Sequence, residues 1–327
     1  MSKPRVRAKK QHYVPRLHLK HFVGCQPKGM LWTYDMERGI ARPSKPMETG
    51  AQNNFYSVKL DDGSYYDDLD KWLQDVENKA TAGYERLLLG EIPEGQERAD
   101  FATFVASLHL RSPSVVKSTA DGFGRFVQMM LNAHWANRDL FERNLDQYER
   151  DVAPITISRD ELWEFHNDPS RYSIKVDQQR GLVAIGASDT IQRMLFDREW
   201  HLVRAASDFF ITSDSPVYRF VSQDQIHPFY GDGGFSNASA EISIPLTPNL
   251  LLLITNRDLP GPHLVLGADG VWQMNKMRAF SADRFLYADS RDDRITKIGA
   301  EFRDARMRME IDGFGPQAEV EVINRMR

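Results

Sequence analysis

The sequence is poor in cysteine and in long apolar runs, and both shortages limit the class of protein. Cys25 is the single cysteine among 327 residues, which excludes an intrachain disulfide and a metal site built from cysteines alone. The longest apolar run, Leu250–Ile254, is far shorter than the roughly 20 residues that a membrane helix needs. The basic N-terminus lacks the apolar stretch of a secretory signal. We therefore expect a soluble, cytoplasmic protein that does not enter a membrane.

Charge is distributed unevenly along the chain. The sequence has 42 basic and 46 acidic side chains, but no acid precedes Asp35, and the first 34 residues hold 8 of the basic ones. Residues 1–10 are predicted to form a basic arm. Two interpretations are open: the arm contacts the phosphates of a nucleic acid, or it is a solvated tail that can fold back on the acidic remainder. The tail is favoured, because no aromatic side chain for base stacking occurs before Tyr13.

The order of the patterns predicts an α+β fold. A short helix from Pro15 and a hairpin come first, then a helical middle, then an antiparallel β region with C-terminal helices. Apolar residues three and four apart predict a first long helix from about Leu69 to Leu88 and a second over 97–111. The expected division is a basic arm over 1–10, one compact domain over 11–312 with a helical lobe at about 65–198 and a β-rich lobe at about 199–290, and a tail over 313–327.

Local signals refine the later part of the chain. A third helical stretch over 114–152, bent at Gly122 or Gly124, is followed by a capping pattern at Ser158 and a further helix over 174–196. Turn signals then predict three hairpins and two last helices. The hairpins span 201–212, 241–255 and 264–274, and the helices span 277–287 and 295–309.

The first cluster with chemical potential is Gln11-His12-Tyr13-Val14-Pro15-Arg16, at the expected entrance of the short helix. His12 can serve as a general base or a metal ligand, and Arg16 can bind phosphate. Backbone N–H groups at a helix entrance also favour anions. The alternative is that His12 and Tyr13 only pack against and cap the first turn.

Four blocks together resemble the domain-of-unknown-function 4238 family, a mainly bacterial family. They are His12-Tyr13-Val14-Pro15, Asn54-Phe55-Tyr56, Leu110-Arg111-Ser112-Pro113 and the segment 210–217 with its Ser213-Asp214-Ser215-Pro216 motif. The resemblance covers about residues 11–290 and also includes Glu77, Asn275, Arg284 and Tyr287. The family carries no established activity, so the resemblance implies a set of positions and no reaction.

The family positions contain the groups that a hard-metal or phosphate site requires. His12, Glu77, Arg111 and Asp214 supply an imidazole, two carboxylates and a guanidinium, and are the candidate catalytic residues. Tyr13, Arg16, Ser213 and Tyr56 are the candidate substrate-binding residues. A divalent cation is a candidate cofactor, although the sequence has no metal-ligand spacing such as HExxH and the metal is unknown. The alternatives are a structural Glu77–Arg111 ion pair and an ordinary turn at Asp214.

Three hypotheses from different classes follow. The first is a metal- or phosphate-dependent hydrolase that acts on nucleic acid or a nucleotide through a polar cleft. The second is a non-enzymatic binding or sensing protein of bacterial or phage origin that holds a small anionic ligand in the same cleft. The third is that the motifs serve mainly as a fold signature, with His12 and Tyr13 joining the N-terminal turn to the turn at Asp214.

Overall fold

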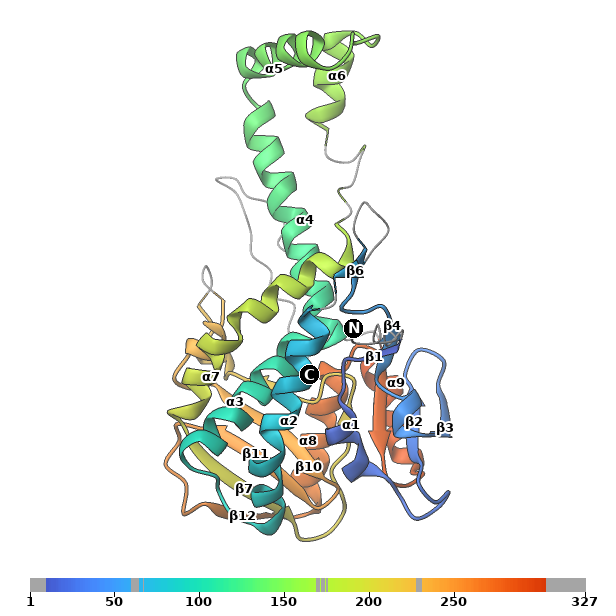
Figure 1. Ribbon diagram of the computed structural model, residues 1–327, viewed down its shortest axis with the longest axis vertical. Helices are drawn as coiled ribbons and strands as arrows, with labels where there is room; N and C mark the ends of the chain where they lie inside the picture. Colours follow the sequence, from blue (N-terminus) through green and yellow to red (C-terminus); the bar gives the residue numbers. More distant parts are fainter. Residues whose placement is uncertain are drawn as a thin grey trace, which may run out of the picture.

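The computed structural model describes residues 10–59, 65–66, 68–168, 171, 174, 176–227 and 231–303. Most of the helices fall within residues 68–196, and the strands lie before or after that stretch, which confirms the α+β class (Figure 1). Lys10, the last residue of the predicted arm, begins a strand, and the rest of the arm lies outside the described residues, as does the predicted C-terminal tail.

The larger sheet has five strands in the order β12-β7-β11-β10-β9. Its strands are β7 (Glu199–Ala205), β9 (Tyr218–Phe220), β10 (Glu241–Thr247), β11 (Leu250–Thr255) and β12 (His263–Leu266). Neighbouring strands are antiparallel except β12, which runs parallel to β7. The expected antiparallel β region is therefore a mixed sheet, because β12 returns to the sheet by a crossover and not by a hairpin.

Both faces of this sheet are buried. On one face, Leu250, Leu252 and Ile254 of β11 join a core with α2 (Asp68–Leu89) and α3 (Gly95–Leu110). On the other face, Leu251 packs with Val271 of α8 (Ala268–Ser281). Successive side chains of a strand point to opposite faces, so the apolar run of β11 supplies both cores.

A second sheet joins the two ends of the described chain. Its order is β3-β2-β13-β8, and α9 (Asp293–Phe302) packs against it through Ile295 and Ile298. The strands are β2 (Leu31–Asp35), β3 (Ile40–Ser44), β8 (Thr212–Ser213) and β13 (Phe285–Ala288). A small antiparallel pair, β5 (Val58–Lys59) and β6 (Tyr65–Tyr66), lies apart from both sheets.

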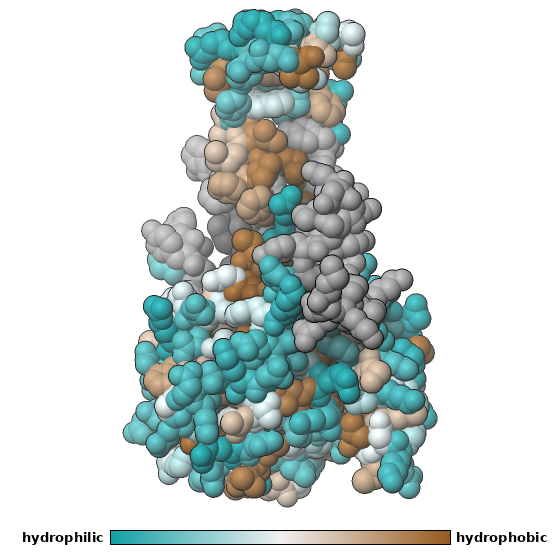
Figure 2. All heavy atoms as spheres, in the orientation of Figure 1, coloured by the Kyte–Doolittle hydropathy of each residue, from teal (hydrophilic) through white to brown (hydrophobic). Residues whose placement is uncertain are grey.

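Three helices form a stalk that projects from the sheets and their covering helices (Figure 1). The helix α4 (Pro113–Trp135) rises from the end of α3 and carries α5 (Arg138–Asp151) and α6 (Arg159–His166) at its tip. Apolar side chains are exposed along α4, among them Phe123, Phe126 and Met130 (Figure 2). None of the helices in the described part of the chain is long and apolar enough to cross a bilayer.

The N-terminal segment lies between the helical layer and the second sheet. The strand β1 (Lys10–His12) pairs with β4 (Ala51–Asn53), and α1 (Arg16–Leu19) continues into a 3-10 turn over Lys20–Phe22. A second 3-10 turn, Pro46–Glu48, lies beside α1. This arrangement brings the first motif next to α2.

Several sequence predictions are confirmed and others are wrong. The helices at α2 and α3, the hairpins β2–β3 and β10–β11, and the Ser158 cap of α6 form as expected. The third helical stretch is divided into α4 and α5 at Asn137, which caps α5. The helix expected over 174–196 is a 3-10 segment, Gln178–Ala187, followed by α7 (Ser188–Phe196).

The remaining β predictions fail because local patterns do not reveal long-range pairing. The strands expected to form a hairpin over 201–212 belong to different sheets, β7 to the larger and β8 to the smaller. The second half of the hairpin expected over 264–274 is the start of α8. The helix expected over 277–287 ends at Ser281, and Phe285 begins β13. The last predicted helix is α9, whose described part ends at Phe302.

Candidate functional site

The backbone of the first motif is fixed by bonds from the segment that follows β3. Val14 N donates to Gly50 O at 3.0 Å, and Gly50 has φ +62°, a conformation that favours glycine. A Cβ on Gly50 would lie 2.9 Å from Val14 Cβ, so the close approach also requires a glycine. Gln11 is buried; its side chain accepts from Tyr56 N at 2.7 Å and donates to Ser57 Oγ at 2.8 Å. The motif is therefore held rigidly next to residues 49–57.

The hydrogen bonds of His12 define its tautomer. Its Nδ1 lies 3.2 Å from Thr49 O, and a carbonyl oxygen only accepts, so Nδ1 carries the proton and Nε2 is the acceptor of the neutral ring. Burial lowers the pKa of His12, while the Thr49 carbonyl and the nearby Glu77 carboxylate oppose that shift. The charge of Arg16 lowers the pKa further. His12 is therefore neutral near pH 7 and able to take up a proton on Nε2.

Glu77 of α2 and Arg111 at the C-terminal end of α3 form the ion pair that the sequence suggested. Arg111 Nη1 donates to Glu77 Oε1 at 2.8 Å, and the guanidinium is fully buried while 25% of the Glu77 side chain is exposed. The pKa of Arg111 is raised: burial alone would lower it, but the charges and hydrogen bonds of Glu77 and Tyr56 outweigh burial. Because the guanidinium is buried, removing the Glu77 carboxylate would lower the free energy of unfolding.

Tyr56 joins His12 to this ion pair. Its hydroxyl donates to His12 O at 3.1 Å and faces the guanidinium of Arg111. Nevertheless, Nε and Nη2 of Arg111 are buried and make no hydrogen bond of normal geometry with the described residues. Tyr56 is thus a buried contact between the motif and the ion pair and does not line an open surface.

A pocket of about 590 Å³ opens beside these groups. Its lining combines three cationic side chains, one carboxylate and an apolar wall. The lining residues are Arg16, Leu17, Lys20, Gly29, Lys45, Pro46, Met47 and Glu77. The helix α1, which supplies Arg16 and Leu17, has only four residues, so its dipole adds little and anion binding here depends on side-chain charge.

Asp214 lies elsewhere and has a different environment. Its carboxylate is 1% exposed and accepts from three consecutive backbone N–H groups, of Asp283 at 2.8 Å, Arg284 at 2.6 Å and Phe285 at 2.8 Å. Burial and the charge of Asp283 raise the pKa of Asp214 to about 7, against the opposing effect of these three donors. With its oxygens used in this way, Asp214 joins β8 to the start of β13.

The two remaining candidates, Tyr13 and Ser213, are near Asp214 and not in the pocket lining. The Tyr13 hydroxyl is hydrogen-bonded to Tyr287, and burial together with the charge of Asp214 raises the pKa of Tyr13. Ser213 is fully buried, and its Oγ accepts from Ser215 N at 3.1 Å. Ser213 therefore stabilises the turn at Asp214, and Tyr13 joins the first motif to β13.

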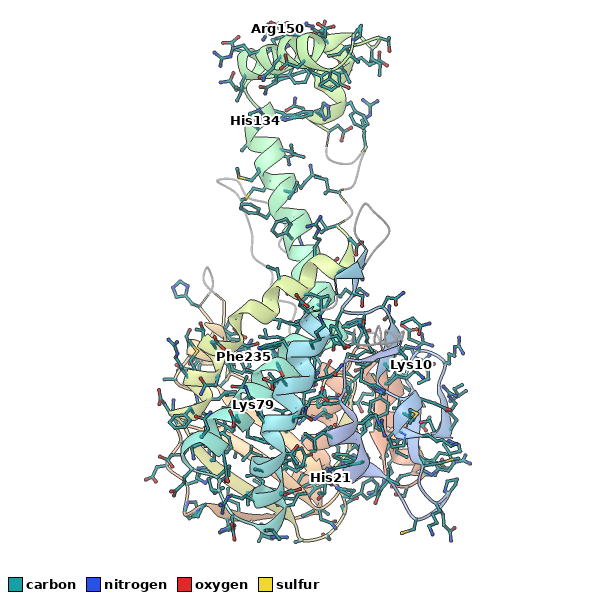
Figure 3. The ribbon with its side chains drawn as sticks, in the orientation of Figure 1. Lys10, His21, Lys79, His134, Arg150 and Phe235 are labelled. Atoms are coloured by element: carbon teal, nitrogen blue, oxygen red, sulfur yellow. The ribbon has the colours of Figure 1, made fainter. Side chains whose placement is uncertain are left out.

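A buried histidine that the sequence analysis did not select connects three parts of the fold. His18 of α1 is fully buried; its Nδ1 lies 3.1 Å from Tyr84 Oη on α2 and its Nε2 lies 2.9 Å from Thr212 Oγ1 on β8. Tyr84 donates its own proton to Leu246 O, so His18 Nδ1 donates to Tyr84 and Nε2 accepts from Thr212. Burial lowers the pKa of His18 to about 3. The next histidine, His21, which is labelled in Figure 3, stacks on Tyr84 with ring centroids 4.8 Å apart.

The sequence-selected residues therefore divide into two groups. His12, Glu77, Arg111, Tyr56 and Arg16 come together at the pocket and the ion pair beneath it. The other group is Tyr13, Ser213 and Asp214. Within the described ranges, no three His, Cys, Asp or Glu side chains are arranged to hold a metal ion. Lys20, Lys45 and Met47 of the pocket were missed, because surface lysines carry no distinguishing pattern in one sequence.

Comparison with known proteins gives a family and no activity. Residues 10–292 match the family described as a protein of unknown function, DUF4238. No curated protein and no solved structure matches the chain.

Proposed function

The chain belongs to the DUF4238 family, which has no assigned function, and we propose from its own geometry that it binds a phosphate-bearing ligand in the pocket beside His12. The observation that carries the proposal is the charge of the lining. Arg16, Lys20 and Lys45 are exposed and form no ion pair with the described residues, yet they converge on one pocket. Three cationic side chains around one concavity favour a di- or polyanion.

The size of the pocket suits a nucleotide or a short piece of nucleic acid. Its 590 Å³ lies within the range of about 300–1,000 Å³ that is usual for small-molecule sites. The protein, which we place in the cytoplasm because its single cysteine fits a reducing compartment, would meet such ligands there. In this proposal Asp214, Tyr13 and Ser213 stabilise the fold and do not contact the ligand.

Binding is tested by calorimetric titration with inorganic pyrophosphate. We expect saturable binding that weakens with added salt and that is at least tenfold weaker in the Lys20→Ala/Lys45→Ala double variant. The double variant Lys117→Ala/Lys297→Ala, which removes two lysines outside the pocket lining, is the matched control. Equal affinities of the two double variants would exclude the pocket as the binding site.

Hydrolysis of the ligand is a second candidate, and the tautomer of His12 favours it. The Thr49 carbonyl fixes the proton on Nδ1, so the neutral ring can accept a proton only on Nε2. A partly buried His12 with a lowered pKa has the protonation state that a general base needs near pH 7. We therefore assign His12 as the candidate base, with Arg16 as the group that stabilises charge on phosphate.

This second candidate is tested with a nucleoside diphosphate and a dinucleotide, each with and without Mg²⁺ or Mn²⁺. Turnover that His12→Gln abolishes while pyrophosphate binding persists would support the enzyme. Binding without turnover under every condition would leave the non-enzymatic ligand-binding protein as the function.

A further inference from the structure

The basic pocket contains one group that does not suit an anion. Glu77 lines the same pocket as Arg16, Lys20 and Lys45, and a quarter of its side chain is exposed. A carboxylate next to bound phosphate would repel it unless another part of the ligand satisfies the carboxylate. The lining is therefore complementary to a ligand that carries phosphate at one end and hydrogen-bond donors at the other.

The hydrogen bonding of Glu77 shows that its carboxylate has capacity for a ligand. Oε1 accepts from Arg111 Nη1, and Oε2 accepts no hydrogen bond from the described residues. An ionised carboxylate can accept about four hydrogen bonds, so a ligand can use Oε2 and the second lone pair of Oε1 together. The ion pair with Arg111 also holds the carboxylate in one orientation, as recognition of a planar group requires.

An apolar surface completes the lining. Leu17, Pro46 and Met47 belong to the same pocket, and Met47 is 57% exposed, which is high for a large apolar side chain. Methionine and proline offer flat or adaptable contact to the face of an aromatic ring. The pocket thus has a cationic part, a carboxylate and an apolar wall, within a volume that holds one nucleotide.

We propose that the ligand is a guanine nucleotide, with its phosphates at Arg16, Lys20 and Lys45 and the N1–H and N2–H₂ edge of guanine on the Glu77 carboxylate. Among the common bases only guanine presents two adjacent N–H donors to one carboxylate, since adenine and cytosine place an acceptor beside their amino group. This inference rests on the proposed phosphate-binding function and specifies which ligand fills the pocket.

The charge of the chain favours a free nucleotide over a polymer. Residues 35–327 contain 34 basic and 46 acidic side chains, so most of the protein repels a long polyanion. A nucleoside diphosphate needs only the few cations that the pocket provides.

The test titrates the full-length protein with GDP, IDP, ADP and inorganic pyrophosphate under identical conditions. IDP keeps N1–H and lacks the 2-amino group, so we expect it to bind at least tenfold more weakly than GDP, and ADP more weakly still. In Glu77→Gln, which retains an acceptor for Arg111, the preference for GDP over ADP should fall below threefold while pyrophosphate affinity is kept. Glu85→Gln, an exposed glutamate of the same helix, is the matched control.

Each outcome separates the two proposals. Equal binding of GDP, IDP and ADP, together with pyrophosphate binding, would overturn the guanine assignment and leave the phosphate site in place. Failure of pyrophosphate and of every nucleotide to bind would overturn both. A single-stranded oligonucleotide that binds more than tenfold tighter than GDP would also overturn the assignment. The comparison of the wild-type titrations decides the question even if a variant does not fold.

Discussion

Glu77 has two roles, since it pairs with a buried guanidinium and also lines the pocket. Removing its carboxylate would leave Arg111 as an unpaired charge that is fully buried. Breaking a buried pair from one side costs about 3–5 kcal/mol, and the partial exposure of Glu77 places the expected loss near the lower end.

We therefore predict that Glu77→Ala lowers the free energy of unfolding by about 3 kcal/mol in urea denaturation. Glu85→Ala, on the exposed side of the same helix, should change it by less than about 0.5 kcal/mol. Similar values for the two variants would show that the Arg111 pair contributes nothing to stability.

His18 makes stability depend on pH. Its pKa is about 3 in the folded protein and near 6.5 when unfolded, so the unfolded chain binds one more proton between these values. The stabilising contribution of neutral His18 is complete above pH 6.5 and decreases as the pH falls toward 3, by about 2 kcal/mol between pH 7 and pH 5.

His18→Gln should remove this dependence. The variant loses stability at pH 7 because the bonds to Tyr84 and Thr212 are weakened, but the difference from wild type should shrink by about 2 kcal/mol when unfolding is measured at pH 5. His263→Gln, an exposed histidine, serves as control. Parallel stability curves for His18→Gln and wild type would contradict the neutral buried state of His18.

Among the elements of the fold, Asp214 and its neighbours connect the second sheet to α8. The carboxylate binds the three amides that follow α8, and Asn275 of α8 binds Phe209 O and Ile211 N just before β8. The segment 213–216 thus forms a contact between β8, β13 and α8 and does not line the pocket.

We predict that Asp214→Asn destabilises the protein and leaves ligand binding unchanged. The Asn side chain places an NH₂ group where a backbone N–H now finds an acceptor, which costs about 1–3 kcal/mol. Asp258→Asn, at an exposed loop position, should be neutral in the same thermal unfolding assay. A folded Asp214→Asn protein that no longer binds pyrophosphate would instead place Asp214 in the binding site.

Elements were predictable from the sequence where periodicity was clean. The apolar face of α2 and the turn between β10 and β11 are local patterns. Both elements form as expected. Only the last part of α8, residues 277–281, lies within a predicted helix, because the buried face of α8 includes Asn275 and Arg278 and apolar spacing alone does not show its start. The pairing of β13 with β2 joins residues about 250 apart, and no local signal encodes it.

For the molecule as a whole, the sequence predicted which residues belong to the site better than it predicted how they are arranged. The pairing of Glu77 with Arg111 followed from two inward-facing charges on neighbouring helices. The separation of Asp214 from His12 could not be predicted from the sequence, because it depends on how the two sheets are joined. His18 was missed for the same reason, since its partners Tyr84 and Thr212 lie 66 and 194 residues away.

The basic start of the chain also has a more specific role than its composition suggested. Lys10, labelled in Figure 3, forms part of β1, and Arg16 and Lys20 belong to the pocket. Positive charge near the N-terminus is thus partly concentrated on one concave surface of an otherwise acidic protein. A small anion would be drawn to that surface.

The most direct measurement is the affinity of inorganic pyrophosphate for Arg16→Ala compared with Arg193→Ala. Both arginines are exposed and form no ion pair with the described residues, but only Arg16 lines the pocket and lies near His12. We expect wild-type affinity for Arg193→Ala and at least a tenfold loss for Arg16→Ala, with both variants folded. Equal affinities for the two variants would contradict the claim that this pocket is the functional site.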